Sequence, residues 1–152
     1  MQILVDADAC PVTVKEILFR AADRRQLMTT LVANRMLKTP RSPWIRAIQV
    51  PQGFDVADNR IAELAQPGDL VITADIPLAA QALARGALVI DPRGEAYTAD
   101  NIEERLSLRS FMEEMRSSGV ATGGPPPYAA ADGKAFADRL DRLLTQMVKT
   151  RK

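Results

Sequence analysis

The sequence predicts an α/β fold: a three-layer α/β/α sandwich around a mostly parallel sheet of about five strands, with a helical C-terminal extension. Apolar, strand-like runs alternate with helical periodicity through residues 1–99. Residues 3–11 and 70–77 are built alike, since each is an apolar run that ends on an aspartate and is closely followed by a proline. Buried strands of parallel sheets have this pattern. We therefore expect one domain over 1–152, with the extension at 100–152.

Proline at a helix start and glycine just beyond a helix end give the expected element limits. The expected strands are 2–6, 27–33, 47–50, 69–74 and 87–90, and the helices between them start at Pro11, near Gly53 and at Pro77, the last closed by Gly86. In the extension, Asp100 and Glu103 resemble a capping box that opens a helix. A last amphipathic helix contains Phe136 to Met147, and residues 117–133 are a Gly/Pro-rich loop, either a functional flap or disordered.

The composition is that of an ordinary globular protein and excludes several classes of chemistry. The chain is 47% hydrophobic and 26% charged, its net charge is +1, and it contains one cysteine. It lacks a long apolar span and a signal peptide, so we expect a cytoplasmic protein with no membrane partner. The absence of histidine removes Ser-His and Cys-His catalysis and mixed Cys/His zinc sites. Carboxylates, lysines or a metal held by oxygen atoms remain.

Aspartates follow the predicted strands at the edge where parallel sheets bind ligands, the carboxyl ends of the strands. Carboxylates that lie within a few ångströms of one another repel unless a proton or a cation sits among them. A divalent metal removes this repulsion and can activate a bound water. The candidates are Asp6, Asp8, Asp55, Asp58, Asp75 and Asp91.

Each aspartate also has a structural alternative. Asp75 and Asp55 stand where a side chain caps the following helix, and for Asp75 capping and metal binding are equally expected. Asp58 can be a solvated acid in a first helical turn, and Asp8 can cap the first helix or face water. Asp6 is the hardest to explain structurally, because a charged residue that ends an apolar strand needs a partner.

Residues 26–54 contain no acidic residue, whereas cations and the single tryptophan fall within them. Basic side chains beside an aromatic ring are typical of a groove for single-stranded nucleic acid. The alternative is a solvated loop with Trp44 packed into the core. The residues concerned are Asn34, Arg35, Lys38, Arg41, Trp44 and Arg46, with Arg105, Arg109, Arg116 and Lys134 as further phosphate contacts.

Two further features have open interpretations. Residues 119–128 can close over the site, with glycine N–H groups offered to an anion, or they can belong to a packing extension. Cys10 precedes a helix start, where the pKa of a thiol falls. Because the sequence offers no base to activate this thiol, a small buried residue is the favoured interpretation.

Four stretches, at 4–12, 53–59, 68–79 and 121–127, together resemble the YaiI/YqxD family of bacterial proteins, which is related to PIN-like and NYN nuclease domains. The resemblance covers nearly the whole chain. It implies a PIN-like α/β/α fold and, by analogy with the superfamily, a metal-dependent ribonuclease. By position it implies that the metal ligands are Asp6, Asp55 and Asp75. Asp8, Asp58 and Asp91 are alternatives for the fourth acid.

The function expected from the sequence is hydrolysis of phosphodiester bonds in RNA with Mg²⁺ or Mn²⁺. Asp6, Asp8, Asp55, Asp58 and Asp75 would be catalytic, and Asn34, Arg35, Lys38, Arg105 and Arg109 would bind the substrate. A homodimer is possible.

Two alternatives remain open. In the first, the chain is a haloacid-dehalogenase-type phosphatase that uses Asp6 and Asp8, with Thr73 in its second motif; Cys10 departs from the first motif, and no lysine follows Thr73 before Lys134. In the second, the chain is a non-catalytic module that binds nucleic acid.

Overall fold

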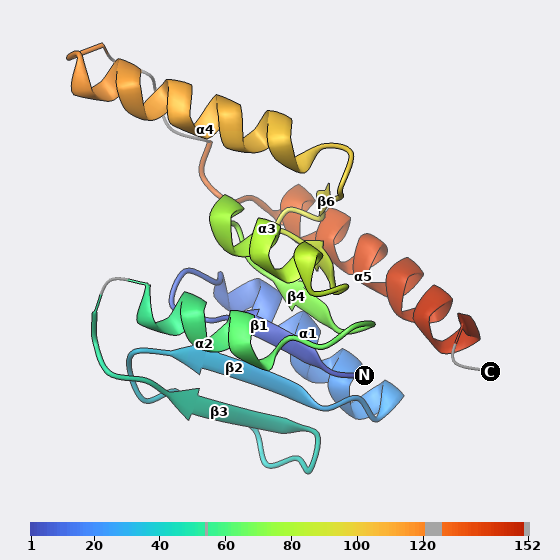
Figure 1. Ribbon diagram of the computed structural model, residues 1–152. Coiled ribbons are helices and arrows are strands. Elements are labelled where there is room, and N and C mark those ends of the chain that lie inside the picture. The colour runs from blue at the N-terminus through green and yellow to red at the C-terminus, as the bar shows by residue number, and fades with distance from the viewer. Residues whose placement is uncertain (54, 121–125, 151–152) are drawn as a thin grey trace.

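The computed structural model describes residues 1–53, 55–120 and 126–150 (Figure 1). Strands and helices alternate through the first part of the chain, and helices make up the last part. The elements are β1 (Ile3–Asp6), α1 (Val12–Arg25), β2 (Thr29–Ala33), β3 (Ile45–Gln49), α2 (Val56–Leu64), β4 (Leu70–Ile72), α3 (Ile76–Ala84), β5 (Leu88–Ile90), β6 (Ala96–Tyr97), α4 (Ile102–Ser117) and α5 (Ala130–Thr150). In the described residues, none of these helices has the length and apolar character needed to cross a membrane.

The strands form one sheet in the order β3-β2-β1-β4-β5-β6, and only β6 runs antiparallel to its neighbour. The chain builds outward from β1 through β2 to β3, then returns to β4 on the other side of β1. The strand order therefore reverses between β1 and β4, and such a switch point opens a crevice at the carboxyl ends of the strands. The register pairs Val5 with Ile72, which brings Asp6, the next residue of β1, beside the end of β4.

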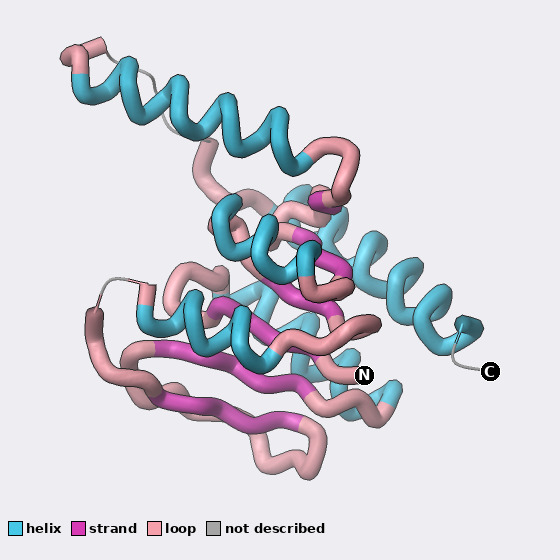
Figure 2. The backbone as a smooth tube through the Cα atoms, viewed as in Figure 1, coloured by secondary structure: helices cyan, strands magenta, loops and turns pink. Residues whose placement is uncertain are grey.

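Helices cover both faces of the sheet, as Figures 1 and 2 show. Successive side chains of β1 point to opposite faces, so Ile3 and Val5 join the core beneath α1 and α5, whereas Leu4 joins the core beneath α2 and α3. The fourth helix, α4, lies against α3 and extends past the sheet. The predicted three-layer α/β/α sandwich with a C-terminal helical extension is confirmed.

Several element limits differ from the prediction. The sequence did not indicate β6, which is two residues long. The last helix begins at Ala130, inside the predicted loop at 117–133. The capping box at Asp100 is wrong: Asn101 is the N-cap residue of α4, and its Oδ1 accepts a hydrogen bond from the Thr98 N–H at 2.9 Å.

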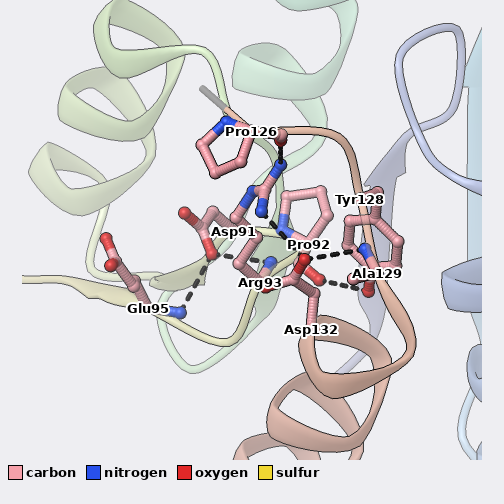
Figure 3. Close-up of polar contacts among 8 residues, drawn as sticks. All are labelled: Asp91, Pro92, Arg93, Glu95, Pro126, Tyr128, Ala129 and Asp132. Atoms are coloured by element: carbon pink, nitrogen blue, oxygen red, sulfur yellow. Dashed lines mark hydrogen bonds and ion pairs between the residues drawn. The ribbon is translucent and has the colours of Figure 1, made fainter. Parts of the chain in front are cut away.

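The start of α5 is attached to the turn after β5 by polar contacts from Arg93 (Figure 3). The Arg93 guanidinium lies 2.9 Å from Asp132 Oδ2, donates to the carbonyl of Pro126, and stands over the Tyr128 ring at 5.6 Å. The Tyr128 hydroxyl donates to the Pro92 carbonyl at 2.7 Å. We call this set the Arg93 clasp. It fixes the end of the predicted flap, whereas residues 121–125 of that flap lie outside the described residues.

Candidate functional site

Asp6 and Asp75 meet at the switch point through Thr73. The Thr73 hydroxyl donates to Asp6 Oδ2 at 2.9 Å and accepts a hydrogen bond from the Asp75 N–H at 2.9 Å. Burial raises the pKa of Asp6, the hydrogen bond from Thr73 lowers it, and the charges of Asp75 and Asp8 raise it further. Asp6 at the end of β1 and Asp75 after β4 are thus joined through one hydroxyl, and their charges repel each other.

Asp75 has the capping role that the sequence offered as an alternative. Its Oδ1 accepts the N–H of Leu78 at 2.9 Å, which satisfies one free donor in the first turn of α3. Its carboxyl group also shares a hydrogen bond with Asp58 of α2. Asp75 is therefore a helix cap and a member of the acidic cluster at the same time.

Asp58 is the most strongly perturbed member of this cluster. Burial is the largest cause that raises its pKa to about 7, followed by the charges of Asp75 and Asp6, the hydrogen bond with Asp75 and the charge of Asp55. The side chain is half-buried in the first turn of α2. Asp58 is thus a first-turn acid, as the alternative interpretation has it, but it is half-buried beside other acids and is not simply solvated.

Three of the aspartates line one small cavity of about 140 Å³, here called the acidic cavity. Asp55 contributes from the N-cap position of α2, where it has a φ of 60° and makes no side-chain capping hydrogen bond. The cavity is lined by Asp55, Asp58, Asn59, Asp75, Pro77, Leu78, Gln81 and Arg109. The cavity thus brings Asp75, which follows the end of β4, together with Asp55 and Asp58 from the start of α2.

Asp8 and Asp91 do not line the acidic cavity and have partners of their own. Asp8 Oδ2 accepts the backbone N–H of Asn34 at 2.9 Å, and its Oδ1 lies 4.0 Å from Arg35 Nε. The N-cap residue of α1 is Pro11, so Asp8 does not cap that helix. Asp91 is buried, and its Oδ1 accepts the N–H groups of Arg93 and Glu95 at 2.9 Å each. Asp91 therefore holds the turn between β5 and β6.

The predicted substrate-binding residues come from two parts of the chain, helix α4 and the segment after β2. Arg109 lines the acidic cavity and forms an ion pair with Glu113 at 3.1 Å. Arg105 is bound to Glu95 at 2.9 Å and lies over the Tyr97 ring, so it supports the structure around β6. The others lie after β2, where Asn34 and Arg35 contact Asp8 and Lys38 is exposed.

The remaining candidates have structural surroundings. Trp44 is half-buried and packs against the core beneath α1 and α5, and Arg46 donates to the Thr30 hydroxyl at 2.8 Å. Cys10 is buried, which raises the pKa of its thiol to about 12. The interpretation of Cys10 as a small buried residue is confirmed, because such a thiol stays protonated at neutral pH.

Sequence reasoning missed three polar neighbours of the cluster. It considered Thr73 only for the phosphatase alternative, although this hydroxyl joins Asp6 to the loop before α3. It did not select Asn59 or Gln81, which line the acidic cavity. Asn59 follows the candidate Asp58 directly, and this adjacent pair of oxygen-bearing side chains could have identified Asn59 as a site residue from the sequence. Gln81 lies in the middle of α3, and its type and spacing give no signal.

The donor chemistry of the cluster suits a hard cation, because Mg²⁺ and Mn²⁺ prefer carboxylate oxygens. Carboxylates forced together without a cation take up a proton instead, and the raised pKa of Asp58 is consistent with that condition. Within the described residues, however, no three acidic or cysteine side chains stand in an arrangement that is ready to hold a metal ion. The carboxylates are therefore of the right type to hold Mg²⁺ or Mn²⁺, but they do not all point to one common position.

Fold and site together define an α/β protein with an acidic cluster at the switch point of a mainly parallel sheet. The family model described as "Uncharacterized BCR, YaiI/YqxD family" matches residues 4–146, and the chain belongs to this family. No solved structure matches the chain.

Curated relatives match almost end to end. A UPF0178 protein of Cupriavidus pinatubonensis is 65% identical over 148 residues, which cover 97% of this chain and 99% of the relative. UPF0178 proteins of Burkholderia cenocepacia and Burkholderia ambifaria are 62% and 64% identical over 146 residues, covering 96% of this chain and 97% of each relative. The family resemblance seen in the sequence is confirmed.

Proposed function

We propose that the acidic cluster is the active site of a phosphodiesterase that cleaves RNA and depends on Mg²⁺ or Mn²⁺. The observation that carries the proposal is that Asp55, Asp58 and Asp75 line one cavity, where the charges of Asp75, Asp6 and Asp55 all raise the pKa of Asp58. Such a cluster is unfavourable for stability unless a proton or a cation neutralises part of its charge, and a cation does so without removing the ligands. The PIN-like relation and the cytoplasmic location predicted from the sequence remain part of this proposal.

The residues of the chain have distinct roles in this proposal. Asp6, Asp55 and Asp75 supply oxygen ligands, and Asp58 supplies a further ligand or positions the attacking water. The metal, when bound, lowers the pKa of a water and offsets the charge of the phosphate. Arg109, at the wall of the acidic cavity, is placed to contact the phosphate backbone. The Thr73 hydroxyl fixes the rotamer of Asp6 through their hydrogen bond.

A cleavage screen with single- and double-stranded RNA and DNA, supplemented with Mn²⁺, tests this function. Asp75→Asn and Asp6→Asn are suitable variants, since asparagine retains an acceptor oxygen for the Leu78 N–H or the Thr73 hydroxyl and removes the charge. We expect cleavage by the wild type, none in excess chelator, and a loss of at least about 100-fold in both variants. Undiminished cleavage by both variants would contradict the proposal.

The phosphatase alternative is favoured by one contact, the hydrogen bond between Thr73 and Asp6 Oδ2, which unites residues of its first two motifs. This mechanism would place a phosphoryl group on Asp6, with Asp8 as acid–base. Asp8, however, is held by the backbone of Asn34 and lies near Arg35. Mass spectrometry of the protein after incubation with a small phosphomonoester decides between the two: a phosphorylated Asp6 supports the phosphatase.

A further inference from the structure

A second, larger cavity lies between the end of β3 and helix α2. Its volume is about 450 Å³, which is within the range of about 300–1,000 Å³ that is usual for small-molecule sites. We call it the β3–α2 cavity. Its lining combines apolar side chains with two carboxamides and one ion pair: Ile48, Gln49, Val50, Pro51, Val56, Asn59, Arg60 and Glu63.

The β3–α2 cavity adjoins the acidic cavity, because Asn59 lines both. Asp58, the preceding residue, belongs to the acidic cavity, and Arg60, the following residue, belongs to the β3–α2 cavity. Successive residues at the start of α2 thus present a carboxylate to one cavity, a guanidinium to the other, and a carboxamide to both. A ligand longer than the acidic cavity can continue past Asn59 into its neighbour.

The chemistry of the β3–α2 cavity suits one nucleotide. Ile48, Val50 and Val56 offer an apolar surface for the face of a base, and the carboxamide of Asn59 can hydrogen-bond to its edge. Arg60 is a cation with a weak partner, since its Nη1 lies 3.6 Å from Glu63 Oε2 and 46% of its side chain is exposed. It can therefore turn to a phosphate with little loss.

We propose that the β3–α2 cavity binds the nucleotide next to the one held at the acidic cavity, and that the substrate is therefore a single strand. This inference rests on the proposed function. A base reaches the apolar wall only when it is unpaired, whereas a base within a duplex must first be taken out of its stack. Arg60 binds the phosphate that joins the two nucleotides, and Asn59, which lines both cavities, hydrogen-bonds to the edge of the base.

This inference is tested by measuring binding under conditions in which no cleavage occurs, so that the result does not depend on the proposed activity. The probe is a fluorescent oligomer of about ten uridines, a length within the usual site sizes for single strands. Its fluorescence anisotropy is measured in excess chelator with wild-type protein, Arg60→Gln and Asn59→Ala. Arg20→Gln is the control, because Arg20 is an exposed cation of α1 on the opposite face of the sheet.

We expect Arg60→Gln and Asn59→Ala to weaken binding about fivefold or more, with Arg20→Gln unchanged. Arg60→Gln also lowers the slope of log affinity against log salt by about 0.7, the change for one lost phosphate contact on a single strand. Glu63→Gln frees Arg60 and strengthens binding. A duplex of the same length binds more weakly than the single strand.

The outcomes separate the two proposals. If the wild type cleaves RNA and Arg60→Gln binds the oligomer as the wild type does, the inference is overturned and the proposed function stands. Tighter binding of the duplex also overturns it. If Arg60 and Asn59 are needed for binding while no substrate is cleaved with Mn²⁺, the inference that the β3–α2 cavity binds a nucleotide stands and the proposed activity fails.

Discussion

At the scale of single residues, Asp58 shows most clearly what the acidic cluster does to stability. Its pKa in the folded protein is about 7, against about 3.9 in an unfolded chain. A raised carboxyl pKa means that the folded state binds the proton more tightly. The stability from this group is therefore complete below about pH 4 and is lost as the pH rises through about 7.

Asp58→Asn should remove this pH dependence in metal-free buffer. Above pH 7 the variant gains stability over the wild type, because one charge leaves a repelling cluster, and we expect about 1 kcal/mol after screening by water at this half-buried position. The difference shrinks as the pH falls from about 7 to about 4, because the wild-type group takes up its proton near pH 7 in the folded protein and only near pH 4 in the unfolded chain. Urea unfolding at several pH values measures it. A variant less stable than the wild type at pH 8 would contradict the electrostatic account.

Asp75 allows the capping role to be separated from the chemical role. Asparagine caps a helix as well as aspartate does, so Asp75→Asn should retain the stability of α3, whereas Asp75→Ala should lose about 1 kcal/mol. Both variants lose the charge and, under the proposed function, both lose cleavage. Thermal unfolding and the cleavage assay are run on the same three proteins. Full cleavage by Asp75→Asn would show that Asp75 only caps α3 and has no role in the reaction.

The sequence was sufficient to select the three aspartates of the acidic cavity, since Asp75 follows the end of β4 and Asp55 and Asp58 stand at the start of α2. The sequence could not tell that Asp8 and Asp91, which were candidates as well, do not line this cavity. Asp8 and Asp91 accept hydrogen bonds from backbone N–H groups of nearby loops. These contacts depend on the conformations of the loops, which cannot be predicted from residue type or spacing.

At the scale of elements, the packing of α5 against the turn after β5 requires a glycine. Gly94 has a φ of +87°, and a Cβ there would lie 2.7 Å from the carbonyl oxygen of Ala135 in α5. Any side chain would therefore push the helix away from the turn that the Arg93 clasp holds. Gly68 has nearly the same φ, +86°, with no atom within 4 Å of a built Cβ. The two glycines are a matched pair.

Gly94→Ala should destabilise the protein by about 2–4 kcal/mol, since backbone strain and the clash with α5 add. Gly68→Ala should cost only the strain of the left-handed conformation, about 1 kcal/mol. Chemical denaturation compares the two. Equal losses would show that α5 does not press on the turn as the structure has it.

The Arg93 clasp gives a second prediction at this scale. Arg93→Gln removes the ion pair with Asp132 and the stacking over Tyr128, so we expect a loss of about 1–2 kcal/mol. Hydrogen exchange should rise in the first turns of α5 and stay unchanged in β1. Arg24→Gln is the control, because Arg24 is exposed and lies 3.7 Å from Asp141 at its nearest approach. Unchanged exchange at α5 would contradict the clasp.

Most elements were predictable because apolar periodicity and proline or glycine positions mark them, as Gly86 does with its φ of +87° after α3. The exceptions have physical reasons. The strand β6 is too short for a periodic pattern and exists through its pairing with β5. The first turn of α5 has few large apolar residues, and Asp132 stabilises it by accepting the Ala129 N–H at 2.8 Å.

At the scale of the whole molecule, the reversal of strand order between β1 and β4 sets where chemistry can occur. It places Asp6 beside Thr73 and Asp75, and α2 then brings Asp55 and Asp58 from a third part of the sequence. The sequence predicted the parallel sheet, from which this meeting follows. It did not predict the β3–α2 cavity, because a hollow depends on how α2 packs beside β3.

Calorimetric titration of the metal-free protein with Mn²⁺ tests the central claim, that these carboxylates share a cation site. The account predicts saturable uptake by the wild type and its loss, by at least about tenfold in affinity, in Asp75→Asn and Asp6→Asn. Arg20→Gln should bind as the wild type does. Absence of uptake by the wild type, or equal uptake by all four proteins, would contradict the account.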